Sequence, residues 1–299
     1  MSYIVYKNDL GELTFSGGLS DFSIREIVGL GTPEKKYQTR EYLDFDGQRT
    51  LSSRFVPRTI SMSFDISGKD TSALTAKLYK ILSKEGTLYT YFNASCRRIT
   101  VNQVKVDSFT RNSSRSRSFV AQFICDNPYF FDTQTVSMPC YETIKNIRYN
   151  EESGKWNLDT PTIWGAKNNN LLLLNTGDIR AYPTFKIHSL GNSDSSNGIE
   201  LLRVKPDSPS EIIQRFALSY ALTDGETLTI SFDPRSDLGR RYLKSSLGVN
   251  LLPFRDENSS LSDFYLEPGE NRIILNNLST GNILSASLSY ENQYIEGVY

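Results

Sequence analysis

A single histidine, His188, limits the catalytic chemistry that the side chains of this protein can perform. A zinc site made of several histidines is excluded, and a histidine-activated nucleophile would have to pair His188 with Cys140 or a serine. The sequence contains no Gly-x-Ser-x-Gly motif, which would place a nucleophilic serine on a sharp turn. We therefore interpret His188 as a structural residue near the end of a strand.

Carboxylates are the next groups that could do chemistry. The chain has 34 acidic residues, and a glycosidase needs two of them flanking the scissile bond, but no local pattern selects a pair. The acidic segments 192–196 and 256–263 carry the oxygen ligands that calcium prefers. Neither has the spacing of a calcium loop, and serine, asparagine and aspartate are also the usual residues of turns. We expect no enzyme activity, no metal and no other cofactor.

The most basic stretch is a serine-rich segment at 110–117, close to Arg97 and Arg98, and it contains three arginines: Arg111, Arg115 and Arg117. Arginines in such a stretch can contact phosphates without regard to sequence. Single-stranded nucleic acid also needs aromatic side chains on which its bases stack, and none lies between these arginines. We therefore interpret the segment as the solvated tip of a hairpin.

Aromatic residues make up 12% of the chain, almost all of them tyrosine and phenylalanine. Two clusters, at 89–92 and 129–131, could form a platform for stacking sugars. Large rings more often fill a core, since each buries a large apolar area. We assign both clusters to the core.

The overall composition describes a globular protein with two domains. The 299 residues include 33 basic and 34 acidic side chains, a balance that argues against a dedicated nucleic-acid binder. Three cysteines without a Cys-x-x-Cys pair predict reduced thiols in the protein interior: Cys96, Cys125 and Cys140. We expect no signal peptide and no association with a membrane, because neither a basic-then-apolar start nor an apolar run of membrane-spanning length is present.

The elements that must position these residues are mostly strands. Alternating apolar residues at 98–106 and 118–125 predict an antiparallel hairpin with a long polar connection. One segment has helical spacing instead, with Leu74, Leu78, Ile81 and Leu82 on one face. We predict a helix at about 71–84, with Asp70, Thr71 and Ser72 as N-cap candidates and Gly86 as its C′ residue.

A second hairpin, at about 30–58, has charged residues on both faces. Its two extended runs flank Asp46-Gly47, a strong turn signal. A two-stranded hairpin is marginally stable by itself, so we expect this one to pack on another chain. Its candidate oligomer-interface residues are Tyr37, Arg40, Tyr42, Phe45, Arg49, Arg54 and Phe55.

The first domain is expected to span residues 1–133. Residues 134–170, rich in glycine, proline and asparagine, form either a connecting segment or the first strands of the second domain. Short strands with turn signals follow through 171–299 and predict a C-terminal β-sandwich. The expected fold class is mainly β, with two domains and one helix.

The order of several motifs resembles the distal tail protein family of long-tailed bacteriophages of the siphophage type. The N-terminal part carries FSGGL at 15–19, the Asp46-Gly47 hairpin, RTISMSFDI at 58–66 before the predicted helix, and FICDNPYF at 123–130. The C-terminal part carries NTGD at 175–178, YPTFKI at 182–187, LTISFDP at 228–234 and LEPGENRI at 266–273. The resemblance covers roughly 10–132 and 170–290.

This resemblance implies a structural hub of a phage tail tip or baseplate. The first domain would be a β-sandwich or split-barrel-like domain with a projecting hairpin, closing a homohexameric ring, and the second a galectin-like sandwich. The ring would join the major tail tube protein or a tail completion protein to a tail-associated tip or lysin protein and a receptor-binding protein. DNA would only pass through its channel, and the protein would be assembled in the host cytoplasm and reside in the virion. The alternative is a carbohydrate-binding host-adhesion module that forms no ring.

Overall fold

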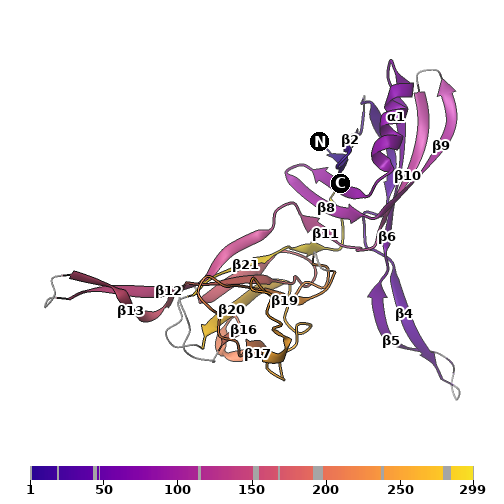
Figure 1. Cartoon of the computed structure of the whole chain (residues 1–299). Helices are drawn as coiled ribbons and strands as arrows, with labels where there is room; N and C mark the ends of the chain where they lie inside the picture. Colours follow the sequence, from indigo (N-terminus) through magenta and orange to yellow (C-terminus); the bar gives the residue numbers. More distant parts are fainter. Residues whose placement is uncertain are drawn as a thin grey trace. The chain divides into compact units, whose positions relative to one another are not determined.

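The computed structural model describes residues 2–18, 20–42, 46, 48–113, 116–150, 155–167, 169–190, 198–236, 239–278 and 284–298. At 108–113, 144–150 and 155–167 the description is of the backbone alone. The chain divides into two compact units: Met1–Thr133 with Gln293–Tyr299, and Gln134–Asn292. The described residues contain one α-helix and many strands, so the prediction of a mainly β, two-domain fold is confirmed (Figure 1).

The first unit is built on one ten-stranded sheet. Its strand order is β22-β11-β8-β7-β1-β2-β3-β6-β10-β9, and adjacent strands are antiparallel except β2 and β3. The strands are β1 (Ser2–Asn8), β2 (Gly11–Ser16), β3 (Phe22–Val28), β6 (Arg58–Ser67), β7 (Gly86–Phe92), β8 (Ser95–Val101), β9 (Gln103–Ser113), β10 (Ser116–Cys125), β11 (Phe130–Asp132) and β22 (Gln293–Tyr294). The described strands of this unit form one continuous sheet whose edge strands β22 and β9 are not paired with each other.

Strict alternation along β6 gives the first unit its core. Ile60, Met62, Phe64 and Ile66 point inward and are fully buried, whereas the intervening residues are polar. Such a period-2 pattern is what a strand with one buried face requires. The helix lies over the same core and contacts β2, β6 and β9.

The helix α1 spans Thr71–Leu82, two residues shorter than predicted. Of the three N-cap candidates, Asp70 caps it, with its carboxylate accepting a hydrogen bond from the Ala73 amide at 2.9 Å. The assignment of Gly86 as a C′ residue is wrong. A Cβ at Gly86 would lie 2.6 Å from the Lys7 carbonyl oxygen, so glycine is needed there because β7 starts in close contact with β1.

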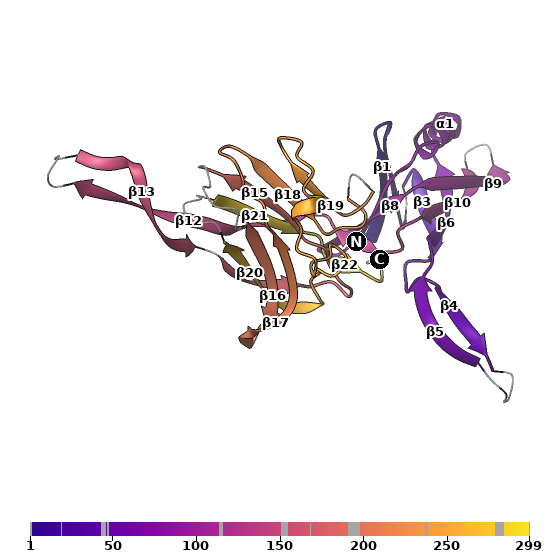
Figure 2. The same ribbon diagram turned by 60° about the horizontal axis from the view of Figure 1, so that its bottom comes forward.

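The second unit contains two facing sheets. A six-stranded sheet has the order β13-β12-β21-β15-β18-β19, and a four-stranded sheet has the order β14-β20-β16-β17 (Figure 2). The strands are β12 (Val136–Asn150), β13 (Lys155–Lys167), β14 (Asn170–Asn175), β15 (Thr184–Ser189), β16 (Ile199–Lys205), β17 (Ser208–Leu218), β18 (Thr227–Ser231), β19 (Tyr242–Ser245), β20 (Gly269–Asn277) and β21 (Leu284–Tyr290). Inward side chains of both sheets, such as Phe185 and Leu201, share one core. A short 3₁₀ helix lies at Leu252–Phe254.

Of the two alternatives expected for 134–170, the structure has the first strands of the second unit: the long antiparallel pair β12–β13, with β12 also pairing with β21. The C-terminal boundary differs from the expected one. Residues 293–299, expected in the second domain, belong to the first unit. There Tyr294 is buried in the first core, and the Gly297 amide donates to the Leu30 carbonyl. A two-residue strand with few apolar side chains gives no local signal of this return.

Cys125 and Cys140 are buried free thiols, as predicted, whereas Cys96 is half-buried. Burial raises the pKa of the Cys125 and Cys140 thiols to about 12. Both should therefore resist a thiol reagent in the native protein near neutral pH and react after denaturation. The folded chain holds these two protons more tightly than the unfolded chain. Their contribution to stability is thus complete below the ordinary thiol pKa of about 8.5 and is lost as the pH rises toward 12. Rapid native labelling of two or more thiols would contradict this assignment.

Candidate assembly surface

The charged hairpin forms a two-stranded sheet of its own within the first unit. Its strands are β4 (Lys35–Glu41) and β5 (Gln48–Phe55), and every residue of both strands except Phe55 is exposed. Figure 1 shows the pair extending from the end of β6 opposite the helix. It therefore lacks the core that normally stabilises a hairpin in water.

The register places four cations on one face of the hairpin. Lys36 lies directly opposite Arg54, and Arg40 lies directly opposite Arg49. Because side chains alternate along β4, both like-charge pairs lie on the same face, and between them Ser52 Oγ donates to Gln38 Oε1 at 3.2 Å. None of the four cations forms an ion pair in the part of the chain that the structure describes. Opposed like charges destabilise a strand pair, so this face is suited to a carboxylate-rich partner.

The opposite face of the hairpin is aromatic and uncharged near its middle. Tyr37, 57% exposed, lies opposite Ser53, and Thr39 follows two residues along the strand. A bulge between the Gln38 and Thr39 pairings leaves Leu51 as an extra residue, 54% exposed. The hairpin thus offers apolar contacts on one side and positive charge on the other.

The structure brings together most of the residues predicted for the interface. Those exposed on the hairpin are Tyr37, Arg40, Tyr42, Arg49 and Arg54. Phe55 lies instead at the base of the hairpin, where its ring packs edge-on against Tyr129 at 5.8 Å between centroids. Phe45 lies outside the described residues. Sequence reasoning missed Lys36, which only the pairing with Arg54 identifies as part of the basic face.

Arg58, the first residue of β6, anchors the base of the hairpin. Its side chain is 3% exposed and donates to the carbonyl oxygens of Gly29 at 2.7 Å, Gly31 at 2.6 Å and Pro128 at 2.8 Å. It also donates to the Ile295 carbonyl. One guanidinium therefore fixes the chain entering the hairpin, the turn before β11 and the C-terminal segment.

The pKa of Arg58 is lowered to about 10 because burial disfavours its charged form. The guanidinium carbon also lies over the ring of Phe130, 4.8 Å from its centroid. Gly29 has a φ of +97°, and a Cβ there would lie 2.4 Å from the Thr59 carbonyl oxygen. The carbonyl that Arg58 binds is thus presented by a backbone conformation that favours glycine.

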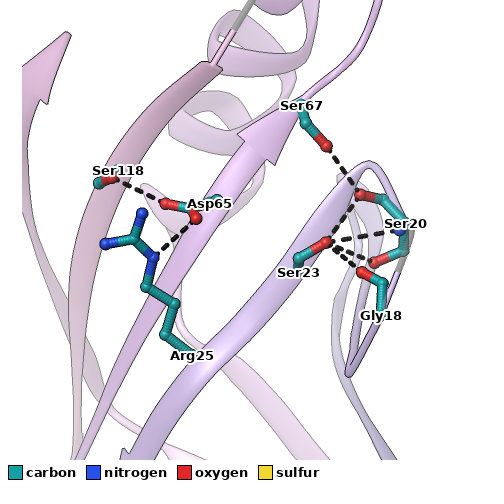
Figure 3. Close-up of polar contacts among 7 residues, drawn as sticks. All are labelled: Gly18, Ser20, Ser23, Arg25, Asp65, Ser67 and Ser118. Atoms are coloured by element: carbon teal, nitrogen blue, oxygen red, sulfur yellow. Dashed lines mark hydrogen bonds and ion pairs between the residues drawn. The ribbon is translucent and has the colours of Figure 1, made fainter. Parts of the chain in front are cut away.

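A polar network on the outer face of the sheet also has a structural explanation (Figure 3). Asp65 accepts hydrogen bonds from Arg25 Nε at 2.6 Å and from Ser118 Oγ at 2.7 Å, which ties β3 and β10 to β6. In the neighbouring turn, Ser23 Oγ donates to the Gly18 carbonyl and Ser67 Oγ to the Ser20 carbonyl. The group contains no nucleophile–base pair, and we assign it to strand alignment.

The other candidate chemical groups do not assemble into a site. His188 Nδ1 lies 3.1 Å from Thr227 Oγ1 on the adjacent strand, which agrees with a structural role. Asp256 accepts from the Asn258 amide and pairs with Arg215, and these contacts lower the pKa of its carboxyl. The segment 192–196 lies outside the described residues. Among the residues that are described, no cluster of three or more His, Cys, Asp or Glu side chains is arranged to hold a metal ion.

The basic stretch separates into parts with different roles. Arg98 Nε donates to the Asp132 carbonyl and Arg97 Nη1 to the Glu296 carbonyl, so both hold neighbouring chain segments. Arg111 pairs with Arg117 across β9 and β10, and Arg115 lies outside the described residues. The helix of the described chain is too short and too polar to cross a membrane.

The aromatic clusters are only partly core. Phe130 is fully buried, as predicted, but Tyr89 and Tyr91 are half-buried on the outer face of β7 and Phe92 is exposed. The Tyr91 ring stacks on Tyr3 of β1 at 4.4 Å between centroids. The core prediction failed here because Leu88 and Thr90 occupy the inward positions of this strand.

No protein family model matches the sequence, and no curated protein matches it. Among solved structures, the SPP1 Dit protein, described as a paradigm of the hub adsorption apparatus of phages that infect Gram-positive bacteria, matches with a TM-score of 0.62 at 12% identity. This match covers 98% of the present chain and 99% of the other.

Two structures of the phage P2 baseplate in its activated conformation are also similar. The one with Ca gives a TM-score of 0.46 at 12% identity, covering 97% of each chain. The one with Sr gives 0.42 at 10% identity, covering 96% of the present chain and 98% of the other. The resemblance to distal tail proteins inferred from the motif order is thus confirmed for the fold: over nearly its whole length, the chain has the fold of the SPP1 Dit protein.

Proposed function

We propose that this protein is the structural hub of a phage tail tip or baseplate, in which six copies close a ring and no residue is catalytic. The observation that carries the proposal is the fold shared with a phage hub protein over the full chain. The exposed hairpin β4–β5 supports it independently, since it has a positive face and a tyrosine-bearing face and packs on no core of its own.

In the proposed ring, the hairpin of each copy packs on a carboxylate-bearing surface of its neighbour. The same contact repeated around an axis is heterologous, and it closes when the rotation between copies divides the circle. The anchor at Arg58 holds the base of the hairpin, so that all copies present it at the same angle to the sheet.

The proposed ring belongs to the virion and is assembled in the host cytoplasm. Its partners are the major tail tube protein or a tail completion protein, a tail-associated tip or lysin protein, and a receptor-binding protein. DNA passes through the central channel without being a ligand, and no membrane is involved. The near balance of 33 basic and 34 acidic residues supports a channel protein that does not retain DNA.

Native mass measurement tests the ring. We expect a species at six times the 33.9 kDa chain mass, about 203 kDa. Replacing Arg40→Glu together with Arg49→Glu should abolish that species, because four unit charges change on the face that meets carboxylates. The control Lys77→Glu/Lys80→Glu makes the same charge change on exposed positions of α1 and should leave the mass unchanged. A ring that persists in the hairpin variant would refute the role of the hairpin.

The alternative, a carbohydrate-binding adhesion module without ring assembly, is favoured by one observation. Tyr3, Tyr89 and Tyr91 form a half-buried group of stacked rings on the outer face of the first unit. Aromatic faces can bind sugars, but the Tyr3 ring already covers one face of Tyr91. Binding on a glycan array that is lost with Tyr89→Ala, in a chain that stays monomeric, would support this alternative over the hub.

A further inference from the structure

The outer face of the four-stranded sheet in the second unit carries exposed apolar side chains. Leu172 and Leu174 on the edge strand β14 are 55% and 56% exposed, and Ile212 on the opposite edge strand β17 is 54% exposed. The alternate residues Leu171 and Leu173 of β14 pack on the core instead. Four consecutive leucines thus give this edge strand two apolar faces, whereas an exposed edge strand normally carries polar or charged side chains.

An arginine lies in the middle of this apolar face. The register aligns Leu172, Arg272, Val204 and Ile212 in one row across all four strands, in which Val204 is itself only 1% exposed. Arg272 Nε is buried without a hydrogen-bond partner, and Arg272 forms no ion pair within the described residues. The charge of this guanidinium is therefore not balanced by a carboxylate within the described residues.

A carboxylate without a partner lies on the same face. Glu270 precedes Arg272 by two residues on β20, opposite the exposed Leu174, and its side chain is exposed. Glu270 likewise forms no ion pair in the described part of the chain. The face therefore combines an apolar stripe with one unpaired cation and one unpaired anion a short distance apart.

Such a surface is complementary to itself. In a two-fold contact the same patch meets itself in reverse, so a cation must face an anion and an apolar stripe must face an apolar stripe. We propose that the face formed by Leu172, Leu174, Ile212, Glu270 and Arg272 binds a second copy of this chain about a two-fold axis. Arg272 of each copy pairs with Glu270 of the other, and the leucines pack between them.

This contact is separate from the proposed ring. It joins the second units of two copies about a two-fold axis, whereas the ring contact is heterologous and uses the hairpin of the first unit. The two are separable by mutation. In the Arg40→Glu/Arg49→Glu background, ring closure is removed while the face on the second unit is intact. We expect this background chain to form a dimer, and a chain that sediments as a monomer at every soluble concentration would overturn the proposal.

Charge exchange between copies provides the decisive experiment. In that background, Arg272→Glu or Glu270→Arg alone should each raise the dimer dissociation constant by about tenfold or more, as expected for a central interface residue. An equimolar mixture of the two variants should restore dimerisation, because each unlike pair is then complementary. The chain carrying both substitutions should also dimerise. Sedimentation equilibrium measures all four cases.

Leu247→Ser serves as the matched control, since Leu247 is a 61% exposed leucine of the same unit away from the face. It should leave the dimer unchanged, whereas Leu172→Ser should weaken it. Near-ultraviolet circular dichroism verifies that each variant is folded. A mixture that dimerises no better than either charge variant alone would refute the proposed pairing, whatever the fate of the ring.

Discussion

Replacing Arg58 with alanine is expected to lower the free energy of unfolding of the first unit by about 3–5 kcal/mol. Four carbonyl oxygens, from Gly29, Gly31, Pro128 and Ile295, lose their donor at once, and the guanidinium that joins them is 3% exposed. They belong to three chain segments that no other single side chain joins among the described contacts. The Arg58→Ala substitution should therefore also release the C-terminal segment and the base of the hairpin locally.

Arg25→Ala is the matched control, since Arg25 is also an arginine that bonds across the same sheet. Its side chain is 54% exposed and pairs with Asp65 at 2.6 Å (Figure 3). An exposed ion pair contributes only about 0–1 kcal/mol. Arg58→Lys should fall between the two, because an ammonium keeps the charge but cannot reach the same carbonyls as the planar guanidinium.

Hydrogen exchange read by mass spectrometry measures these effects in the first unit separately from the second. We expect Arg58→Ala to accelerate exchange in β6, which begins at Arg58, and in β11 and β22, which adjoin its partners Pro128 and Ile295. Equal protection of these strands in the Arg58→Ala and Arg25→Ala variants would show that the four carbonyl bonds do not hold this region together.

The sequence predicts the elements whose periodicity is strong and local. The stripe Leu74, Leu78, Ile81 and Leu82 identifies the helix, and the Asp46-Gly47 turn between two extended runs identifies the hairpin. Both signals act within about a dozen residues, so no tertiary information is needed. The mainly β class follows from the same short-range alternation.

Arg58 and the C-terminal return are not predictable in this way. Arg58 follows Val56-Pro57 at the start of an alternating strand, and its burial depends on carbonyls up to 237 residues away in the chain. Tyr294 and Gln293 form a two-residue strand whose partner β11 is far away in sequence. Only tertiary pairing brings these groups together, and a lone arginine before an alternating strand has no local signature.

The sequence predicts which segment forms the candidate interface more accurately than it predicts which residues of that segment share a face. Charge on both faces of the hairpin is visible in the sequence, but the segregation of Lys36, Arg40, Arg49 and Arg54 onto one face depends on the register and its bulge. The register also shows that Phe55 is an anchor at the base. The face around Arg272 gave no signal at all, because Leu171–Leu174 are indistinguishable in sequence and separate only when the strand has an inner and an outer side.

Leu78→Ala should lower the free energy of unfolding by about 2–5 kcal/mol, the range for truncating a fully buried leucine. Leu78 is 0% exposed and lies in the core beneath α1. Alanine has a higher helix propensity than leucine, so the loss reports packing and not helix formation. Leu78→Met, which nearly conserves volume, should cost less than about 1.5 kcal/mol, and Lys77→Ala on the exposed face of the helix should change little.

The comparison of Leu78→Ala with Arg40→Glu/Arg49→Glu separates folding from assembly. The core variant should melt at a lower temperature but keep the native mass of the wild type well below its midpoint, because the hairpin surface is unchanged. The hairpin variant should lose the assembled species. Its melting temperature should stay close to that of the unassembled wild-type chain, because its exposed cations contribute nothing to the core. A Leu78→Ala chain that loses assembly while fully folded would mean that the helix, and not only the hairpin, contacts a neighbouring copy.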